Sequence, residues 1–230
     1  MKFKGILLTL AIICSSCGSS SEDNTVESPS CWFFGDSITV GYGASTTKNR
    51  WTSKLCAAKG WSENNLGANG ETLLKASEST GYGSFFDRYQ TLIPTKPATG
   101  KYVFIAYGVN DCGFNFDDYT PSLFSTQLQT IITFANSKGW ANSDIVVLCG
   151  YFAHDASWTN PFGGQVLPSA ASTSRYNSFI TAAQTVAQNN TGVYFVNPFN
   201  AYDATNLIDN VHPDDAGYAA IATFVASQVP

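Results

Sequence analysis

Short apolar runs alternate with helical patterns five times along this chain of 230 residues. The clearest run, Tyr102 to Tyr107, is bounded by glycines, as expected for a strand buried on both faces. The alternation predicts an α/β fold: a five-stranded parallel sheet between two layers of helices. Such sheets bind ligands outside the carboxyl ends of their strands. The expected strands are residues 31–35, 64–66, 102–107, 144–149 and 192–196, and the expected helices are residues 51–59, 72–79, 121–137, 170–189 and 213–229.

The beginning of the chain has the pattern of an export signal. A basic start over residues 1–4 precedes an apolar run over residues 5–13 that is too short to span a bilayer. Small residues then precede Cys17, as in a bacterial lipoprotein processing site, so Cys17 is the candidate for lipid attachment. An ordinary secretory leader is the alternative. We therefore expect an exported protein, either anchored to a membrane by lipid or secreted. Its three parts are a signal peptide (1–17), a flexible tether (18–30) and one folded domain (31–230).

The charge balance narrows the class of partner. Seventeen acidic residues outnumber 12 basic ones, and no basic cluster follows the leader. A nucleic-acid partner is therefore not expected, because binding phosphates requires concentrated Lys and Arg. Polyanionic substrates are disfavoured for the same reason. We expect a monomer that acts on a small-molecule or polysaccharide substrate.

Four cysteines follow the leader, and none has a Cys-x-x-Cys spacing, so no metal site is expected. An even number of cysteines in an oxidising compartment permits disulfides. We favour a Cys112–Cys149 bridge, because each of the two follows an expected strand at the same end of the sheet. Buried free thiols are the alternative.

A candidate nucleophile and a candidate base lie at opposite ends of the domain. Ser37 follows the first strand in a Gly-Asp-Ser turn, where Gly35 allows a sharp bend. A serine needs a base to take its proton, and that base works best when a third group orients it. Of the two histidines, His212 follows Asp209 by three residues, a spacing that lets the carboxylate reach one ring nitrogen. Alternatively, Ser37 caps a helix and His212 shapes a turn.

A serine that attacks a carbonyl carbon takes up an acyl group. This acyl transfer also needs hydrogen-bond donors for the oxyanion that forms on the carbonyl oxygen. The amide of Asn110 follows a buried strand, and the backbone N–H groups of Gly70 and Ser37 are further candidates. The alternative is a turn cap for Asn110 and a positive φ for Gly70. His154 is a poor base because the side chain of its neighbour Asp155 points away from it, so substrate contact fits it better. Candidates for substrate contact are Asp36, Tyr151, His154, Trp158 and Phe162.

Together these motifs resemble those of the SGNH (GDSL-type) hydrolase superfamily. The matching blocks are residues 35–39, 65–72, 108–111 and 209–213, in the family's order. The resemblance implies a flavodoxin-like three-layer α/β/α sandwich without a cofactor. It also implies roles for five residues: Ser37 as nucleophile, His212 as base, Asp209 as its orienter, and Gly70 and Asn110 as oxyanion donors.

By this resemblance the protein is a serine esterase that hydrolyses carboxylic esters through an acyl-enzyme. We favour the acetyl groups of carbohydrates as substrate, since aromatic residues are expected beside the site. The alternatives are a lipid-directed esterase of the lysophospholipase or thioesterase type, and a non-catalytic carbohydrate-binding module on an esterase fold.

Overall fold

A computed structural model describes residues 27–75, 81–114, 118–151 and 169–230. The expected signal peptide and most of the expected tether lie outside these ranges. Within them, no helix combines the length and apolar character needed to cross a membrane.

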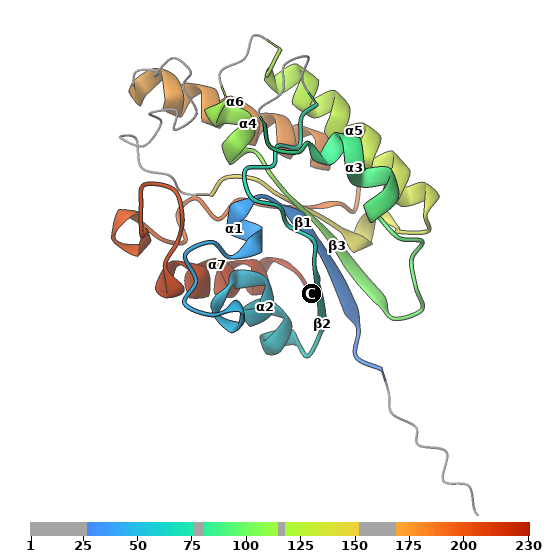
Figure 1. Cartoon of the computed structure of the whole chain (residues 1–230). Coiled ribbons are helices and arrows are strands. Elements are labelled where there is room, and N and C mark those ends of the chain that lie inside the picture. The colour runs from blue at the N-terminus through green and yellow to red at the C-terminus, as the bar shows by residue number, and fades with distance from the viewer. Residues whose placement is uncertain (1–26, 76–80, 115–117, 152–168) are drawn as a thin grey trace, which may run out of the picture.

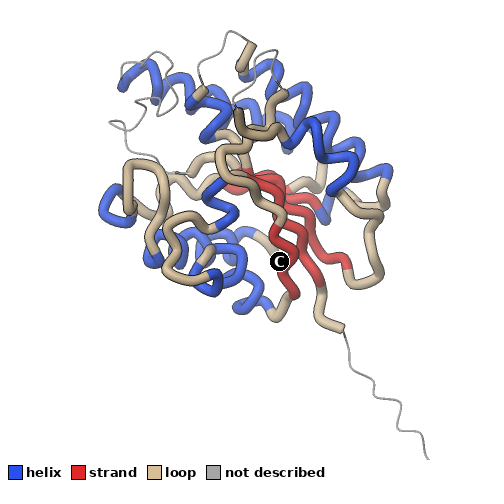
Figure 2. The backbone as a smooth tube through the Cα atoms, in the orientation of Figure 1, coloured by secondary structure: helices blue, strands red, loops and turns tan. Residues whose placement is uncertain are grey.

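Five parallel strands form a single sheet in the order β2-β1-β3-β4-β5 (Figures 1 and 2). The strands are β1 (Ser30–Gly35), β2 (Ser62–Asn65), β3 (Gly100–Ala106), β4 (Ile145–Leu148) and β5 (Tyr194–Val196). The helices are α1 (Ser37–Val40), η1 (Thr47–Asn49), α2 (Trp51–Lys59), α3 (Phe85–Leu92), α4 (Val109–Gly113), α5 (Pro121–Ser137), η2 (Asn142–Asp144), α6 (Ser169–Asn189), η4 (Ala204–Asn206) and α7 (Asp215–Gln228). The predicted α/β fold with a five-stranded parallel sheet is confirmed.

Helices cover both faces of the sheet. Helices α2 and α7 pack together on one face, while α3, α5 and α6 cover the other (Figure 1). β1 is buried from both sides, because Phe33 meets Trp51 of α2 with ring centroids 5.4 Å apart and Phe34 stacks on Phe85 of α3 at 5.0 Å. Consecutive side chains of this strand thus anchor the two helical layers, which explains why its second half is apolar on both faces.

The strand order places a topological switch point between β1 and β3. From β1 the chain crosses first to β2 on one side and then to β3 on the other, so the connections diverge between β1 and β3. The two strands end level with each other, since Gly35 pairs with Ala106 in the register. In open α/β sheets such a divergence is where ligands bind. Ser37 follows one of these strand ends and Asn110 the other.

One predicted helix is wrong in position. We expected a helix over residues 72–79, but residues 72–75 are not helical and 76–80 lie outside the described residues. The N–H groups of Leu73 and Leu74 donate instead to the carboxylate of Asp111, at 3.2 and 2.8 Å. A side chain distant in sequence therefore satisfies these two donors, and the helix of this segment is α3.

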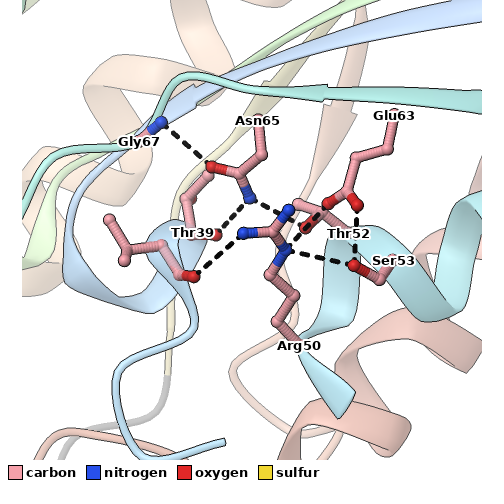
Figure 3. Close-up of polar contacts among 8 residues, drawn as sticks. Thr39, Arg50, Thr52, Ser53, Glu63, Asn65 and Gly67 are labelled. Carbon is pink, nitrogen blue, oxygen red and sulfur yellow. Dashed lines mark hydrogen bonds and ion pairs between the residues drawn. The ribbon is translucent and has the colours of Figure 1, made fainter. Parts of the chain in front are cut away.

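Polar side chains hold the turn after β1 against the end of β2 (Figure 3). Asn65 donates through Nδ2 to the carbonyl oxygen of Thr39 at 2.6 Å and accepts through Oδ1 from the N–H of Gly67 at 3.1 Å. Beside it, Arg50 forms an ion pair with Glu63 at 3.0 Å that joins the start of α2 to β2. Two of the sequence blocks are thereby fixed relative to each other.

Candidate active site

Ser37 begins a short helix at the carboxyl end of β1. Asp36 caps this helix, accepting a hydrogen bond from the N–H of Ile38 at 2.9 Å. A side chain could not replace Gly35, because its Cβ would lie 2.1 Å from Oγ1 of Thr39 and 2.7 Å from the carbonyl oxygen of Ala106. The turn therefore depends on the glycine that the sequence places there.

The structure brings the three predicted members of a catalytic triad together. Oγ of Ser37 lies 2.8 Å from Nε2 of His212, and Nδ1 of His212 lies 2.7 Å from Oδ2 of Asp209. When Nδ1 carries the proton that the carboxylate accepts, Nε2 is free to accept the hydroxyl proton of Ser37. This is the arrangement that activates a serine for nucleophilic attack.

The loop that carries the histidine is organised by Asp209. Its Oδ1 accepts from the backbone N–H groups of Val211 and His212, each at 2.7 Å, while Oδ2 holds the ring. Partial burial opposes ionisation of this carboxyl, but these hydrogen bonds outweigh it and hold its pKa below the ordinary value. Asp209 therefore stays ionised opposite the imidazole.

One predicted oxyanion donor, Asn110, is bonded to the segment that carries the other, Gly70. Nδ2 of Asn110 donates to the carbonyl oxygen of Glu71, the residue after Gly70, at 3.0 Å. Gly70 has a φ of +71°, a conformation that favours glycine. The segment before it lies against the nucleophile turn, because the N–H of Ala68 donates to the carbonyl oxygen of Gly35 at 2.8 Å. The amide of Asn110 carries two hydrogens, of which this hydrogen bond uses one.

The buried carboxylate of Glu71 anchors the segment that carries Gly70. Glu71 accepts from the hydroxyl of Tyr107 at 2.7 Å and from Nε of Arg88 at 2.8 Å. Burial raises the pKa of Glu71, while the hydroxyl and the guanidinium oppose that rise. The sequence analysis missed these three residues, because the contacts join separate elements, and an isolated Arg or Tyr in the sequence does not indicate its partner.

Two predicted substrate contacts are corrected by burial. Asp36 and Tyr151 are both 0% exposed, so neither side chain lies on a surface that a substrate can reach. Asp36 is a helix cap, and burial raises its pKa to about 7. Tyr151 packs in the core, where its carbonyl oxygen accepts from the hydroxyl of Tyr176 at 2.9 Å. The other three candidates, His154, Trp158 and Phe162, lie outside the described residues.

The described residues contain four cysteines, all of them buried thiols outside any disulfide: Cys31, Cys56, Cys112 and Cys149. The bridge favoured between Cys112 and Cys149 is thus absent, and both thiols act as small apolar core residues. Burial raises the pKa of Cys112 to about 12, so it is not a reactive thiolate. The described ranges contain no group of three or more His, Cys, Asp or Glu side chains that could hold a metal ion.

Two exposed tyrosines beside the triad and the oxyanion segment escaped the sequence analysis. The ring of Tyr42 lies 4.5 Å from that of His212, centroid to centroid, and Tyr42 is 51% exposed. The ring of Tyr82 covers Gly70 so closely that a Cβ there would lie 2.3 Å from it. The position of Tyr42 between two glycines, directly after the nucleophile turn, is the one sequence signal that could have drawn attention to it.

Solved structures resemble this one in fold. A carbohydrate acetylesterase family member from Sinorhizobium meliloti has 17% sequence identity and a TM-score of 0.66, over 86% of this chain and 95% of its own. A carbohydrate esterase family 2 enzyme with a carbohydrate-binding domain, from Corynascus thermopiles (Myceliophthora fergusii), has 16% identity and a TM-score of 0.68, over 87% and 65%. A salicylyl acyltransferase from a tetracycline biosynthetic pathway has 15% identity and a TM-score of 0.59, over 89% and 55%.

At the level of sequence, no curated protein matches the chain. A family model does match, over residues 33–220, which include the nucleophile turn at one end and the histidine loop at the other. The matched range thus contains every residue of the predicted triad and both predicted oxyanion donors, Gly70 and Asn110. The chain belongs to the GDSL-like lipase/acylhydrolase family.

Proposed function

We propose that this ester hydrolase cleaves carboxylic esters through an acyl-enzyme on Ser37, with His212 as base and Asp209 as its orienter. The observation that carries the proposal is the continuous relay from Ser37 Oγ to His212 at 2.8 Å and from His212 to Asp209 at 2.7 Å. A non-catalytic binding module would have no need of this alignment, which favours catalysis over that alternative.

In the first half of the reaction, Oγ of Ser37 attacks the carbonyl carbon of the ester while its proton passes to Nε2 of His212. The carbonyl oxygen becomes an oxyanion, which accepts hydrogen bonds from Asn110 Nδ2 and the N–H groups of Gly70 and Ser37. The bond between the carbonyl carbon and the alcohol oxygen then breaks. The departing alcohol takes the proton from His212, and the acyl group remains on Oγ.

In the second half, water replaces the alcohol. It attacks the acyl carbon and gives a proton to Nε2 of His212, forming a second oxyanion in the same place. The bond from the acyl carbon to Oγ breaks, the proton returns to Ser37, and a carboxylic acid leaves. The triad is restored with no net change in protons or electrons.

For the substrate we propose acetyl esters of carbohydrates. Two proteins of similar fold are described as a carbohydrate acetylesterase family member and a carbohydrate esterase, which supports this class by analogy. A lipid-directed esterase is the alternative, and transfer of the acyl group to an acceptor other than water is the activity described for a third similar fold.

The test uses acetate release from a panel of acetylated polysaccharides, together with p-nitrophenyl acetate, octanoate and palmitate. We expect activity on the acetylated polymers and preference for the acetate among the chromogenic esters. Ser37→Ala should abolish all of it. Preference for palmitate would contradict the carbohydrate assignment, and full activity in Ser37→Ala would contradict the acyl-enzyme. Acylation of an added sugar acceptor in place of acid release would identify a transferase.

We also propose that the leader directs export and that Cys17 receives lipid. The support is the basic start, the short apolar run and the small residues before Cys17. Metabolic labelling with a radioactive fatty acid should label the wild-type protein and not a Cys17→Ala variant. Equal labelling of both would exclude Cys17 as the attachment site.

A further inference from the structure

Three large apolar side chains are exposed in the described part of the chain: Tyr42 (51%), Tyr82 (39%) and Ile208 (53%). Two of them adjoin through the backbone of Gly43, where a Cβ would lie 2.8 Å from Cδ1 of Ile208. Exposed side chains of this kind are ordinary when scattered singly, but these two residues both contact His212. The ring of Tyr42 lies 4.5 Å from the imidazole, centroid to centroid, and the N–H of Ile208 donates to the carbonyl oxygen of His212 at 2.9 Å. We call Tyr42 and Ile208 the histidine-side face.

The backbone of Tyr42 is held firmly while its ring stays in solvent. Its N–H donates to the carbonyl oxygen of Ser37 at 2.9 Å, and its own carbonyl oxygen accepts from the buried hydroxyl of Tyr218 at 2.7 Å. The glycines on either side have φ values of +92° and +97°, and Pro213 crowds the second of them, with 2.7 Å between its carbonyl oxygen and a Cβ built there. A ring presented on a rigid backbone loses little freedom on binding a ligand.

The reaction determines which part of the substrate meets this face. His212 must deliver its proton to the leaving alcohol, so the alcohol oxygen lies within hydrogen-bond reach of Nε2, at about 3 Å. The ring of Tyr42 lies 4.5 Å from the same imidazole, centroid to centroid. The carbon atoms next to the alcohol oxygen therefore approach Tyr42, while the acyl group lies toward Gly70 and Tyr82.

We infer that Tyr42 is a specificity-determining residue that stacks against the sugar ring of the leaving alcohol, with Ile208 extending the contact. The inference rests on the proposed function and names the side chain that would select a carbohydrate alcohol. Ile208 of the histidine-side face directly precedes Asp209, whose side chain is 47% exposed. An aromatic face beside a polar acceptor matches a pyranose, which has apolar C–H faces and a rim of hydroxyls.

The test compares two acetate esters that differ only in the alcohol: a methyl glycoside that carries a single acetyl group, and ethyl acetate. Acetate release is measured for both, and the readout is the ratio of the two kcat/KM values. Because the acyl-enzyme is identical, this ratio reports only on the alcohol side. We expect Tyr42→Ala to lower the ratio about five- to tenfold, mainly through KM for the glycoside.

Variants of the same position separate a flat ring from apolar contact in general. Tyr42→Phe keeps the ring and should keep the ratio, whereas Tyr42→Leu should lower it as Tyr42→Ala does. A ratio restored by Leu would overturn the inference and favour an alkyl alcohol. Tyr82→Ala is the matched control. Tyr82 is also an exposed tyrosine, but its ring lies against Gly70 and not against His212, so this variant should have the same ratio as the wild type. An equal fall in Tyr82→Ala would overturn the specific role of Tyr42.

The outcomes also separate this inference from the proposed function. If both esters are cleaved in a Ser37-dependent manner and Tyr42→Ala leaves the ratio unchanged, the inference alone is overturned. If the wild type cleaves ethyl acetate and no sugar acetate, the carbohydrate assignment fails and the inference with it. If neither ester is cleaved by the wild type, the proposed hydrolysis itself is contradicted.

Discussion

Asp209 holds His212 at two points, through Nδ1 of the ring and through the backbone N–H, each at 2.7 Å. The carboxylate thus determines both the direction of the imidazole and the course of the chain that carries it. A single side chain holds both the ring and the backbone of His212, which explains how a three-residue spacing suffices.

Replacing this carboxylate should disable the base. In Asp209→Asn the amide NH₂ faces Nδ1, so the ring carries its proton on Nε2 and cannot accept from Ser37. We expect kcat to fall by about 10³–10⁴ with folding preserved. Asp203→Asn is the matched control. Asp203 also accepts a hydrogen bond from a backbone N–H, that of Thr205 at 2.8 Å, but it has no proposed role in catalysis. A fall of less than tenfold in Asp209→Asn would contradict the role of Asp209.

Gly70→Ala should damage catalysis more than stability. Its φ is +71°, and the new Cβ would lie 2.3 Å from the Tyr82 ring, so the N–H is displaced. We expect kcat to fall about 10²–10³-fold, as for loss of one oxyanion donor. Gly60→Ala carries similar backbone strain at φ +69°, with nothing within 4 Å of the added Cβ. It should cost about 1–2 kcal/mol of stability and leave kcat unchanged. Equal kcat values for Gly70→Ala and Gly60→Ala would contradict the role of Gly70 as an oxyanion donor.

Asn110→Ala should remove a donor that acts in the transition state. We expect kcat to fall about 10²–10³-fold while KM changes little, because the oxyanion forms only during reaction. Asn136→Ala serves as control, since Nδ2 of Asn136 likewise donates to a backbone carbonyl, that of Trp140 at 2.9 Å, in a different part of the molecule. A rise in KM with constant kcat would assign Asn110 to ground-state binding instead.

The buried carboxyl of Asp36 should make stability depend on pH. Burial raises its pKa to about 7, helped by repulsion from Asp111 and Glu71 and opposed by the N–H of Ile38. Between about pH 4 and pH 7 the unfolded chain gives up this proton before the folded one does. The free energy of unfolding therefore falls as pH rises through that window, and this loss is complete above it.

The measurement is urea denaturation of the wild type and Asp36→Asn at about pH 4 and about pH 8. The amide oxygen keeps the helix cap without a charge to bury, so the variant should gain on the order of 2–4 kcal/mol relative to the wild type at the higher pH. The difference between the two proteins isolates Asp36 from carboxyls whose pKa is lowered, such as Glu63. Parallel pH dependences would show that Asp36 does not titrate in this range.

The sequence predicted the parts of the fold and site that depend on local pattern. Apolar strand runs and the histidine loop are of this kind, because Asp209 and His212 interact within one turn. Positions decided by distant partners were missed. Nothing near residues 72–75 indicates that Asp111 takes their N–H donors, and nothing in the aspartate of the nucleophile turn indicates that it is buried. The exposure of Tyr42 likewise depends on packing around it and not on its neighbours in sequence.

Ser37 and its base are separated by 175 positions in the chain. During synthesis the nucleophile emerges early, whereas the imidazole that activates it arrives only with the final loop and α7, which packs on α2. Under the proposed mechanism, a nascent or truncated polypeptide contains an ordinary, unreactive hydroxyl. Esterase activity begins with the closure of the amino-terminal and carboxyl-terminal parts of the chain upon each other, so the appearance of activity reports completion of the whole domain.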